Sequence, residues 1–167
     1  MAYYPDLSDY EYHRREFFRP GTKNVGWLSA EHPFDIAPPT EELLDALWAC
    51  CRISVAQMRG FHICEMCPSG EETERGERQD EKLLLGTSEI RVFSDGGIVY
   101  AAPTLIYHYV DRHQYRPPDD FVRALLRGPS PSEPEYIARL ERLGLEWRHT
   151  SIPSPRGRFR LGDPPPK

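Results

Sequence analysis

Three side chains that bind transition metals lie within one stretch of six residues. His62 supplies an imidazole, and Cys64 and Cys67 form a Cys-x-x-Cys turn. Such a turn brings two sulfurs to one zinc ion. If the chain from 60 to 64 is extended, His62 and Cys64 project to the same side, because side chains two apart share a face of a strand. The stretch therefore predicts a local half-site with three ligands.

A later segment offers two candidates for the fourth ligand, His108 and His113. We predict a helix over residues 103–113, with Pro103 in its first turn. At about 100° per residue, His113 falls in the middle of the apolar arc of this helix and His108 falls on its polar side. The two histidines stand about 140° apart, so both would bind only if the helix end unwinds. We expect His113 as the fourth ligand, with His108 as the alternative.

Other interpretations of these residues stay open. Cys64 and Cys67 could form a redox pair, although that motif normally begins a helix and the Pro68-Ser69-Gly70 that follows disfavours one. His113 could also be a neutral core histidine that is bonded to a carbonyl. Metal binding is the interpretation that uses all of these side chains together.

The number of ligands separates a structural site from a catalytic one. Two thiolates and two imidazoles close a zinc site, whereas a catalytic zinc keeps one position for water. With only three ligands, Glu65 would be the nearest general base, as in a zinc-dependent hydrolase or a deaminase-like enzyme. The separate His-x-Glu and Pro-Cys-x-x-Cys segments of cytidine deaminases do not occur in that form here. We predict structural Zn²⁺, no catalytic residue, and a solvated Glu65.

Charge and composition narrow the class of partner and the compartment. The net charge of −5 and the pI near 5.7 do not suit phosphate-backbone binding, which needs clustered Lys and Arg. The chain has no run of about 20 apolar residues, and residues 1–6 are neither basic nor apolar. We therefore expect a cytoplasmic protein that binds neither nucleic acid nor membrane, with reduced cysteines. Cys50 and Cys51, in an apolar helical pattern, should be core residues.

The fold class follows from the alternation of short strand and helix patterns. Residues 1–149 predict a single zinc-binding α+β domain, in which a small antiparallel sheet is flanked by short helices and stapled by the metal. The clearest strand signal is a hairpin around residues 94–97, where Ser-Asp-Gly-Gly separates two β-rich runs. A further short strand is expected over 24–28. Residues 150–167 predict a disordered tail rich in Pro and Arg.

Residues that begin or end helices predict where the helices of this domain lie. Thr40 is the expected N-cap of an apolar helix, and two amphipathic helices are expected over 119–127 and 133–143. The residues from 58 to 64 mix aromatic, β-branched and small side chains, and they predict a strand that ends at the Cys-x-x-Cys turn. The polar residues 69–82 predict a loop without strands.

Four pieces of sequence are distinctive in combination. They are Tyr4-Pro5-Asp6-Leu7-Ser8, Asn24-Val25-Gly26-Trp27-Leu28, Arg59-Gly60-Phe61-His62 with Cys64 and Cys67, and Tyr100-Ala101-Ala102-Pro103 through His108-Tyr109 to His113, Tyr115 and Pro117-Pro118. In this combination the chain resembles an uncharacterised bacterial, largely actinobacterial, domain family of unknown function, over residues 3 to 127. The resemblance implies no particular activity.

The sequence thus favours a non-enzymatic, zinc-stabilised cytosolic binding or regulatory protein. Its expected partner is another protein, because an acidic surface suits a basic partner. A toxin that the protein neutralises, or a component of a defence or secretion locus, would fit this description. The rival hypothesis is the zinc hydrolase or deaminase-like enzyme with Glu65 as its general base.

Overall fold

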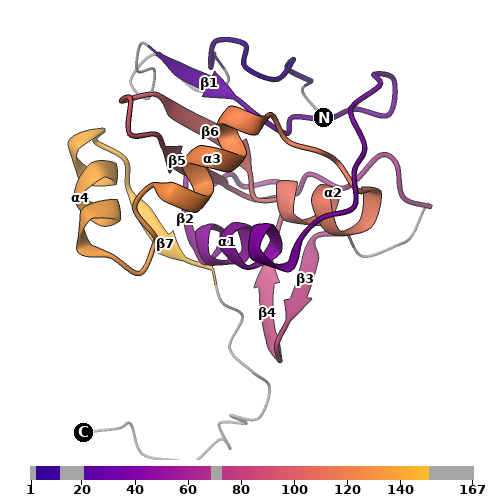
Figure 1. The fold of residues 1–167 in the computed structure, drawn as a ribbon. Coiled ribbons are helices and arrows are strands. Elements are labelled where there is room, and N and C mark those ends of the chain that lie inside the picture. Colours follow the sequence, from indigo (N-terminus) through magenta and orange to yellow (C-terminus); the bar gives the residue numbers. More distant parts are fainter. Residues whose placement is uncertain (1–2, 12–20, 69–72, 151–167) are drawn as a thin grey trace, which may run out of the picture.

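The computed structural model describes residues 3–11, 21–68 and 73–150 of the 167-residue chain. It confirms the α+β class. The elements in chain order are β1 (Thr22–Asn24), α1 (Glu41–Cys51), β2 (Ile53–Val55), β3 (Arg75–Arg78), β4 (Glu81–Leu84), β5 (Glu89–Phe93), β6 (Val99–Pro103), α2 (Ile106–His113), α3 (Asp119–Arg127), α4 (Pro134–Arg142) and β7 (Trp147–His149) (Figure 1). The predicted tail over 150–167 lies outside the described residues, apart from its first residue.

Five strands form the main sheet, in the order β1-β6-β5-β2-β7. Strands β5 and β6 pair antiparallel around the turn at 94–97, so the predicted hairpin is confirmed. Gly97 has a φ of +82° there, a conformation that glycine adopts without steric cost. One pair departs from the predicted antiparallel sheet, because β1 pairs parallel to β6. A parallel pair needs a long connection, and the chain between β1 and β6 passes through α1 and four strands.

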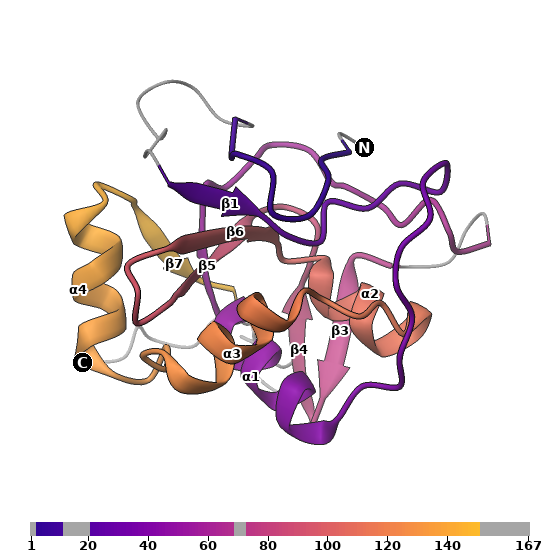
Figure 2. The ribbon, with the colours of Figure 1, turned by 45° about the horizontal axis from the view of Figure 1, so that its top comes forward.

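The central strand β5 is buried on both faces. Side chains alternate along a strand, so Ile90 and Val92 face one side and Arg91 and Phe93 face the other. Ile90 and Val92 join the main core with side chains of α1, α2 and α3. These three helices lie together on one side of the sheet in both views (Figures 1 and 2). On the other side, Phe93 packs with α4 in a second cluster around Tyr136.

Helix α1 begins where the sequence predicts. The backbone N–H of Leu43 donates to Thr40 Oγ1 at 3.2 Å, and Glu41 and Glu42 lie in the first turn, where carboxylates favour the positive end of the helix dipole. Helix α3 has the predicted bounds, and α4 lies within one residue of its predicted bounds at each end. Local capping and periodicity were enough to place these three helices.

Helix α2 begins later than the sequence predicts. Pro103 belongs to β6, not to the first turn of a helix over 103–113. Strand β1 pairs only with residues 99–101, so Pro103 lies where β6 is an edge strand and its missing N–H costs no ladder bond. After two turn residues, α2 runs over Ile106–His113 and ends at Gln114, which has a φ of 54°.

The polar stretch predicted as a loop contains the hairpin β3–β4, which projects from the body below α1 in Figure 1. Few of its side chains are buried, and for this reason its pattern lacks a strand signal. Leu83 of β4 is fully buried in the main core, and at Gly76 an added Cβ would lie 2.9 Å from the Trp48 ring. Arg78 bonds Glu41 and Asp45 of α1. The hairpin is thus attached by one buried leucine, by the close approach of Gly76 to Trp48 and by charges.

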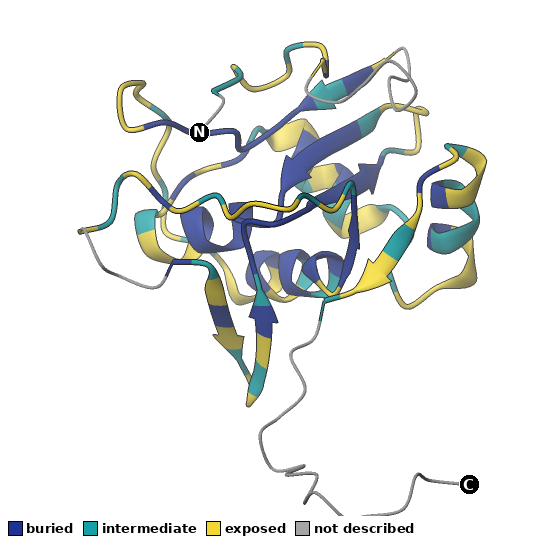
Figure 3. Cartoon of the chain, turned by 180° about the vertical axis from the view of Figure 1, so that it is seen from behind, coloured by how far each residue is buried: buried dark blue, intermediate teal, exposed yellow. Residues whose placement is uncertain are grey.

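The residues from 56 to 68, named here the connecting segment, join β2 to the rest of the chain without helix or strand. The sequence prediction placed a strand over 58–64, but the strand of this region, β2, lies earlier, at Ile53–Val55. In Figure 3 the connecting segment crosses the near side of the molecule as a run of exposed and half-buried residues. The short strand expected over 24–28 is likewise displaced, to β1.

A buried ion pair lies on the face of β5 that looks away from α1, α2 and α3. Arg91 Nη1 lies 2.7 Å from Glu89 Oε2, and the two side chains are 2% and 0% exposed. Tyr10 donates its hydroxyl to both carboxylate oxygens at 2.9 Å. Burial raises the pKa of Tyr10, so the phenol keeps its proton and remains a donor. This network attaches the N-terminal residues to the middle of the sheet.

Removing the cation should destabilise the fold strongly. We predict that Arg91→Met lowers the free energy of unfolding by about 3–5 kcal/mol, because it leaves the Glu89 carboxylate buried without its counter-charge. Urea unfolding measures the change. The matched control is Arg123→Met, which breaks an exposed pair with Asp120 and should cost less than about 1 kcal/mol. Equal losses for the two variants would contradict a role for the buried pair.

Candidate metal site

Four side chains bring their ligand atoms together at one end of α2. The sulfurs of Cys64 and Cys67 and one ring nitrogen each of His108 and His113 all lie within 4.8 Å of one another. Cys64 Sγ is 3.2 Å from His113 Nε2. Cys67 Sγ is 3.3 Å from the Nε2 atoms of both histidines. This Cys₂His₂ group could hold a metal ion.

The spacing of the four atoms fits a tetrahedral ion. With bonds of about 2.3 Å to sulfur and about 2.0 Å to nitrogen, the edges of such a tetrahedron measure about 3.3 Å between nitrogens, about 3.5 Å between sulfur and nitrogen, and about 3.8 Å between sulfurs. The three sulfur–nitrogen separations given above, 3.2 to 3.3 Å, are slightly shorter than the corresponding edge, so an ion would fit after a small outward shift. Two thiolates and two neutral imidazoles would also balance a charge of 2+.

Both histidines of α2 reach the group, although the sequence analysis expected only one. Their positions differ by about 140° around the helix axis, so each ring has to turn only about 70° to reach the line midway between them. An imidazole is long enough for this, and the two ring centroids lie 5.1 Å apart. Helix α2 remains helical to His113. The expectation that both could bind only after the helix end unwinds is therefore wrong.

His108 lies on a side of α2 that the sequence marked as polar, yet it is only 8% exposed. All residues from Ile106 to Val110 are buried, more than one apolar arc can supply. A tertiary contact buries His108, because the connecting segment covers this second side of the helix and brings Cys67 to His108. The spacing of apolar residues within α2 does not indicate that another segment covers this side of the helix. The Cys-x-x-Cys turn was the one sequence signal for it.

His62 was predicted as a ligand but is not among the four residues. Its backbone N–H donates to the carbonyl oxygen of Gly86 at 2.8 Å, and burial lowers the pKa of its imidazole. With both histidines of α2 beside the sulfurs, the tetrahedron is complete without His62.

The cysteine turn is held by contacts outside the Cys₂His₂ group. The backbone N–H of Cys64 donates to Oγ1 of Thr73, which is 2% exposed. Met66 and Cys67 pack against the main core. Glu65 is exposed, and its Oε2 accepts the backbone N–H of Ala30 at 3.3 Å. Glu65 therefore belongs to the surface of the turn and not to the ligand group.

The other two cysteines are core residues, as predicted. Cys50 and Cys51 are buried in α1, and Cys51 Sγ donates to the Thr104 carbonyl oxygen at 3.5 Å. Burial raises the pKa of the Cys50 thiol to about 12. A thiol that stays protonated is a poor metal ligand. The metal-binding chemistry of the described residues is thus concentrated at Cys64 and Cys67.

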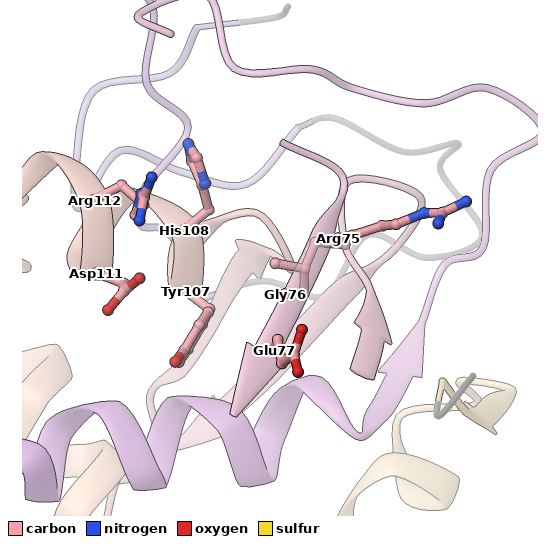
Figure 4. A pocket seen from close by; sticks show the side chains of 8 residues that line it. Arg75, Gly76, Glu77, Tyr107, His108, Asp111 and Arg112 are labelled. Atoms are coloured by element: carbon pink, nitrogen blue, oxygen red, sulfur yellow. The ribbon is translucent and has the colours of Figure 1, made fainter. Parts of the chain in front are cut away.

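A pocket of about 270 Å³ lies next to His108, between α2 and the β3–β4 hairpin. Its wall carries both signs of charge, with Asp111 and Glu77 beside Arg112 and Arg75 (Figure 4). In Figure 4 Arg75 extends away from the other labelled side chains. The charged groups therefore do not converge on one point, as the binding of a small anion would require.

Comparison with known proteins identifies one family. The model of a domain of unknown function (DUF7919) matches residues 2–126. All four residues of the Cys₂His₂ group fall within the match, whereas α4 and β7 lie beyond it. No curated protein and no solved structure matches the chain. Among the described residues, none of the helices has the length and apolar character to cross a membrane.

The contact between the connecting segment and Gly86 gives a test of how the site is held. Gly86 and Gly97 both have positive φ, +77° and +82°, but an added Cβ meets the His62 carbonyl oxygen at 2.2 Å only at Gly86. Gly97→Ala should lower the free energy of unfolding by about 1–2 kcal/mol, the cost of the left-handed backbone. Gly86→Ala should cost about 1–3 kcal/mol more through the clash. Equal losses in thermal or urea unfolding would show that the segment is not held against Gly86.

Proposed function

Since the chain belongs to the DUF7919 family, a domain of unknown function, we propose its role from the geometry of the site. The protein is a non-enzymatic, zinc-stabilised cytosolic binding or regulatory protein. Its structural Zn²⁺ is bound by Cys64, Cys67, His108 and His113. The observation that carries this proposal is that two sulfurs and two ring nitrogens lie within 4.8 Å of one another.

The chemistry of the donors selects zinc among the common metals. Thiolate and imidazole in a tetrahedron suit Zn²⁺, whereas Mg²⁺ and Ca²⁺ take oxygen ligands. The carboxylates nearest in sequence, Glu65 and Asp111, are not members of the group. A donor set of two sulfurs and two ring nitrogens, without oxygen, therefore favours zinc.

A structural role follows from the number of donors and from what they join. Four protein ligands leave no position for water, and a catalytic zinc needs one. The ligands connect two parts of the chain, the irregular connecting segment and α2, that are far apart in sequence. An ion at this point would hold the segment in place and add its binding free energy to the stability of the folded chain.

The alternative is a zinc-dependent hydrolase or a deaminase-like enzyme with Glu65 as its general base. It requires one of the four donors to leave the ion, and it requires Glu65 to turn from the Ala30 N–H toward the opened position. The pocket beside His108 would then have to receive the substrate. The structural role needs none of these changes, and for this reason we prefer it.

The partner is proposed on charge alone. With a net charge of −5, the protein would associate most readily with a basic protein, such as a toxin that it neutralises or a component of a defence locus. The same charge argues against nucleic acid as the partner.

Metal analysis tests the first step. The purified protein should contain one zinc per chain, and removal of the metal with a chelator should lower the melting temperature by at least about 5 °C, because an ion that binds only the folded state stabilises it. Elemental analysis and calorimetry on the same sample measure both. A zinc content well below one per chain would reject the site, and an unchanged melting temperature would reject its structural role.

Substitution of single residues tests the ligand set. Cys64→Ser, Cys67→Ser, His108→Gln and His113→Gln should each lower the zinc content and the melting temperature. His62→Gln is the matched histidine control, and Cys51→Ala is the cysteine control; both should retain the metal. If His62→Gln lost zinc while His108→Gln kept it, the ligand set predicted from the sequence would be right and the present one wrong.

A further inference from the structure

We propose that the Cys₂His₂ group is a redox switch, in which a peroxide joins Cys64 and Cys67 as a disulfide and releases the zinc. The inference rests on the proposed zinc site, because it names how that same site is regulated. While the two cysteines are reduced, the ion holds the connecting segment against α2. When they are oxidised, the segment loses this tie.

The two sulfurs are placed for a disulfide. Cys64 and Cys67 are three residues apart, and the chain bends between them, at residues 65–67. The ligand atoms of the group lie within 4.8 Å of one another, so the sulfurs must approach by at most about 2.8 Å to form an S–S bond of about 2.05 Å. Rotation of both side chains about their Cα–Cβ bonds supplies a movement of this size.

Cys67 can meet a small oxidant, and Cys64 can react with the product. Cys67 is partly exposed, in a turn that also contains the exposed residues Glu65 and Pro68, whereas Cys64 is only 5% exposed. A cysteine that binds zinc is a thiolate, and the thiolate is the form that reacts with oxidants. The buried Cys64 is therefore shielded from the oxidant itself, but it lies beside the sulfur that is oxidised first.

The reaction balances in two steps with one hydrogen peroxide. The Cys67 thiolate attacks one oxygen of the peroxide, the O–O bond breaks, a sulfenic acid forms and hydroxide leaves. The Cys64 thiolate then attacks the Cys67 sulfur, the S–S bond forms, the S–O bond breaks and a second hydroxide leaves. The two sulfurs lose two electrons and the peroxide oxygens gain them. Two protons from the solvent convert the hydroxides to water.

Formation of the disulfide ends zinc binding at the site. Disulfide sulfurs carry no negative charge, so only the neutral imidazoles of His108 and His113 remain. Two neutral ligands neither complete the tetrahedron nor balance a charge of 2+. The bond from the His62 N–H to the Gly86 carbonyl oxygen does not involve the ion. Oxidation therefore releases the connecting segment from α2 and leaves its attachment at Gly86 in place.

The other cysteines do not compete for the oxidant. The chain has four cysteines, and Cys50 and Cys51 are buried in α1, where burial raises the pKa of both thiols. Thiols that stay protonated and buried react slowly. The disulfide that a peroxide produces in the folded chain is thus defined, and it joins Cys64 to Cys67 within one molecule.

Zinc release and thiol titration on the full, zinc-loaded chain test the switch. Hydrogen peroxide should release the zinc to a colorimetric zinc indicator while mass spectrometry of the digested protein detects the Cys64–Cys67 disulfide. The thiols that react in denaturant should fall from four to two, because the disulfide removes a pair. The melting temperature should fall by at least about 5 °C, as after chelation. Dithiothreitol with added zinc should restore the zinc content and the melting temperature.

The control and the contrary outcomes are distinct. Cys51→Ala should release its zinc and form the same disulfide. A zinc-loaded chain that keeps its metal in peroxide overturns the switch and leaves the structural site standing. Zinc loss accompanied by sulfinic acids or by disulfides between chains, in place of the Cys64–Cys67 bond, does the same. A chain that contains no zinc before peroxide is added rejects the metal site and the switch together.

Discussion

The position of the connecting segment is the constraint on which the site depends. This segment has no helix or strand of its own, so its place is set by contacts with other parts of the chain, two of which lie beside the site. Gly86 receives the backbone of His62 at a distance that only glycine allows. The two histidines of α2 then receive the sulfurs of Cys64 and Cys67. Between these contacts the segment covers the second side of α2, and this cover is the reason why His108 is buried.

The two faces of the sheet are secured by different chemistry. On the side of α1, α2 and α3 the contacts are apolar, and Ile90 and Val92 of β5 contribute to one continuous core. On the other side, β5 presents Glu89 and Arg91, whose buried pair is closed by the Tyr10 hydroxyl. A buried pair of this kind adds little net stability, but the loss of one partner is costly. It therefore fixes where the N-terminal residues lie more than it strengthens the fold.

Sequence reasoning succeeded where the cause of a structure is local. The Thr40 cap, the bounds of α3 and the turn at 94–97 follow from residues a few positions apart, and the structure contains all three. It failed where the cause is a distant contact. The β3–β4 hairpin has little apolar pattern because, besides Leu83, it attaches to α1 through Gly76 and Arg78. Of the four residues that converge, the pattern indicated Cys64, Cys67 and His113, and it left His108 as the alternative because only the fold covers that side of α2.

The proposed closed metal site fixes a segment that has no regular structure of its own. A segment without regular structure loses much conformational entropy when it holds exposed apolar side chains such as Phe61 and Ile63 in one arrangement. A metal that fixes the cysteine turn, together with the His62–Gly86 contact, reduces that cost before any partner arrives. A four-ligand ion would then serve recognition by holding the exposed residues of the segment in one arrangement, and this explains why a site with no place for water can still be functional.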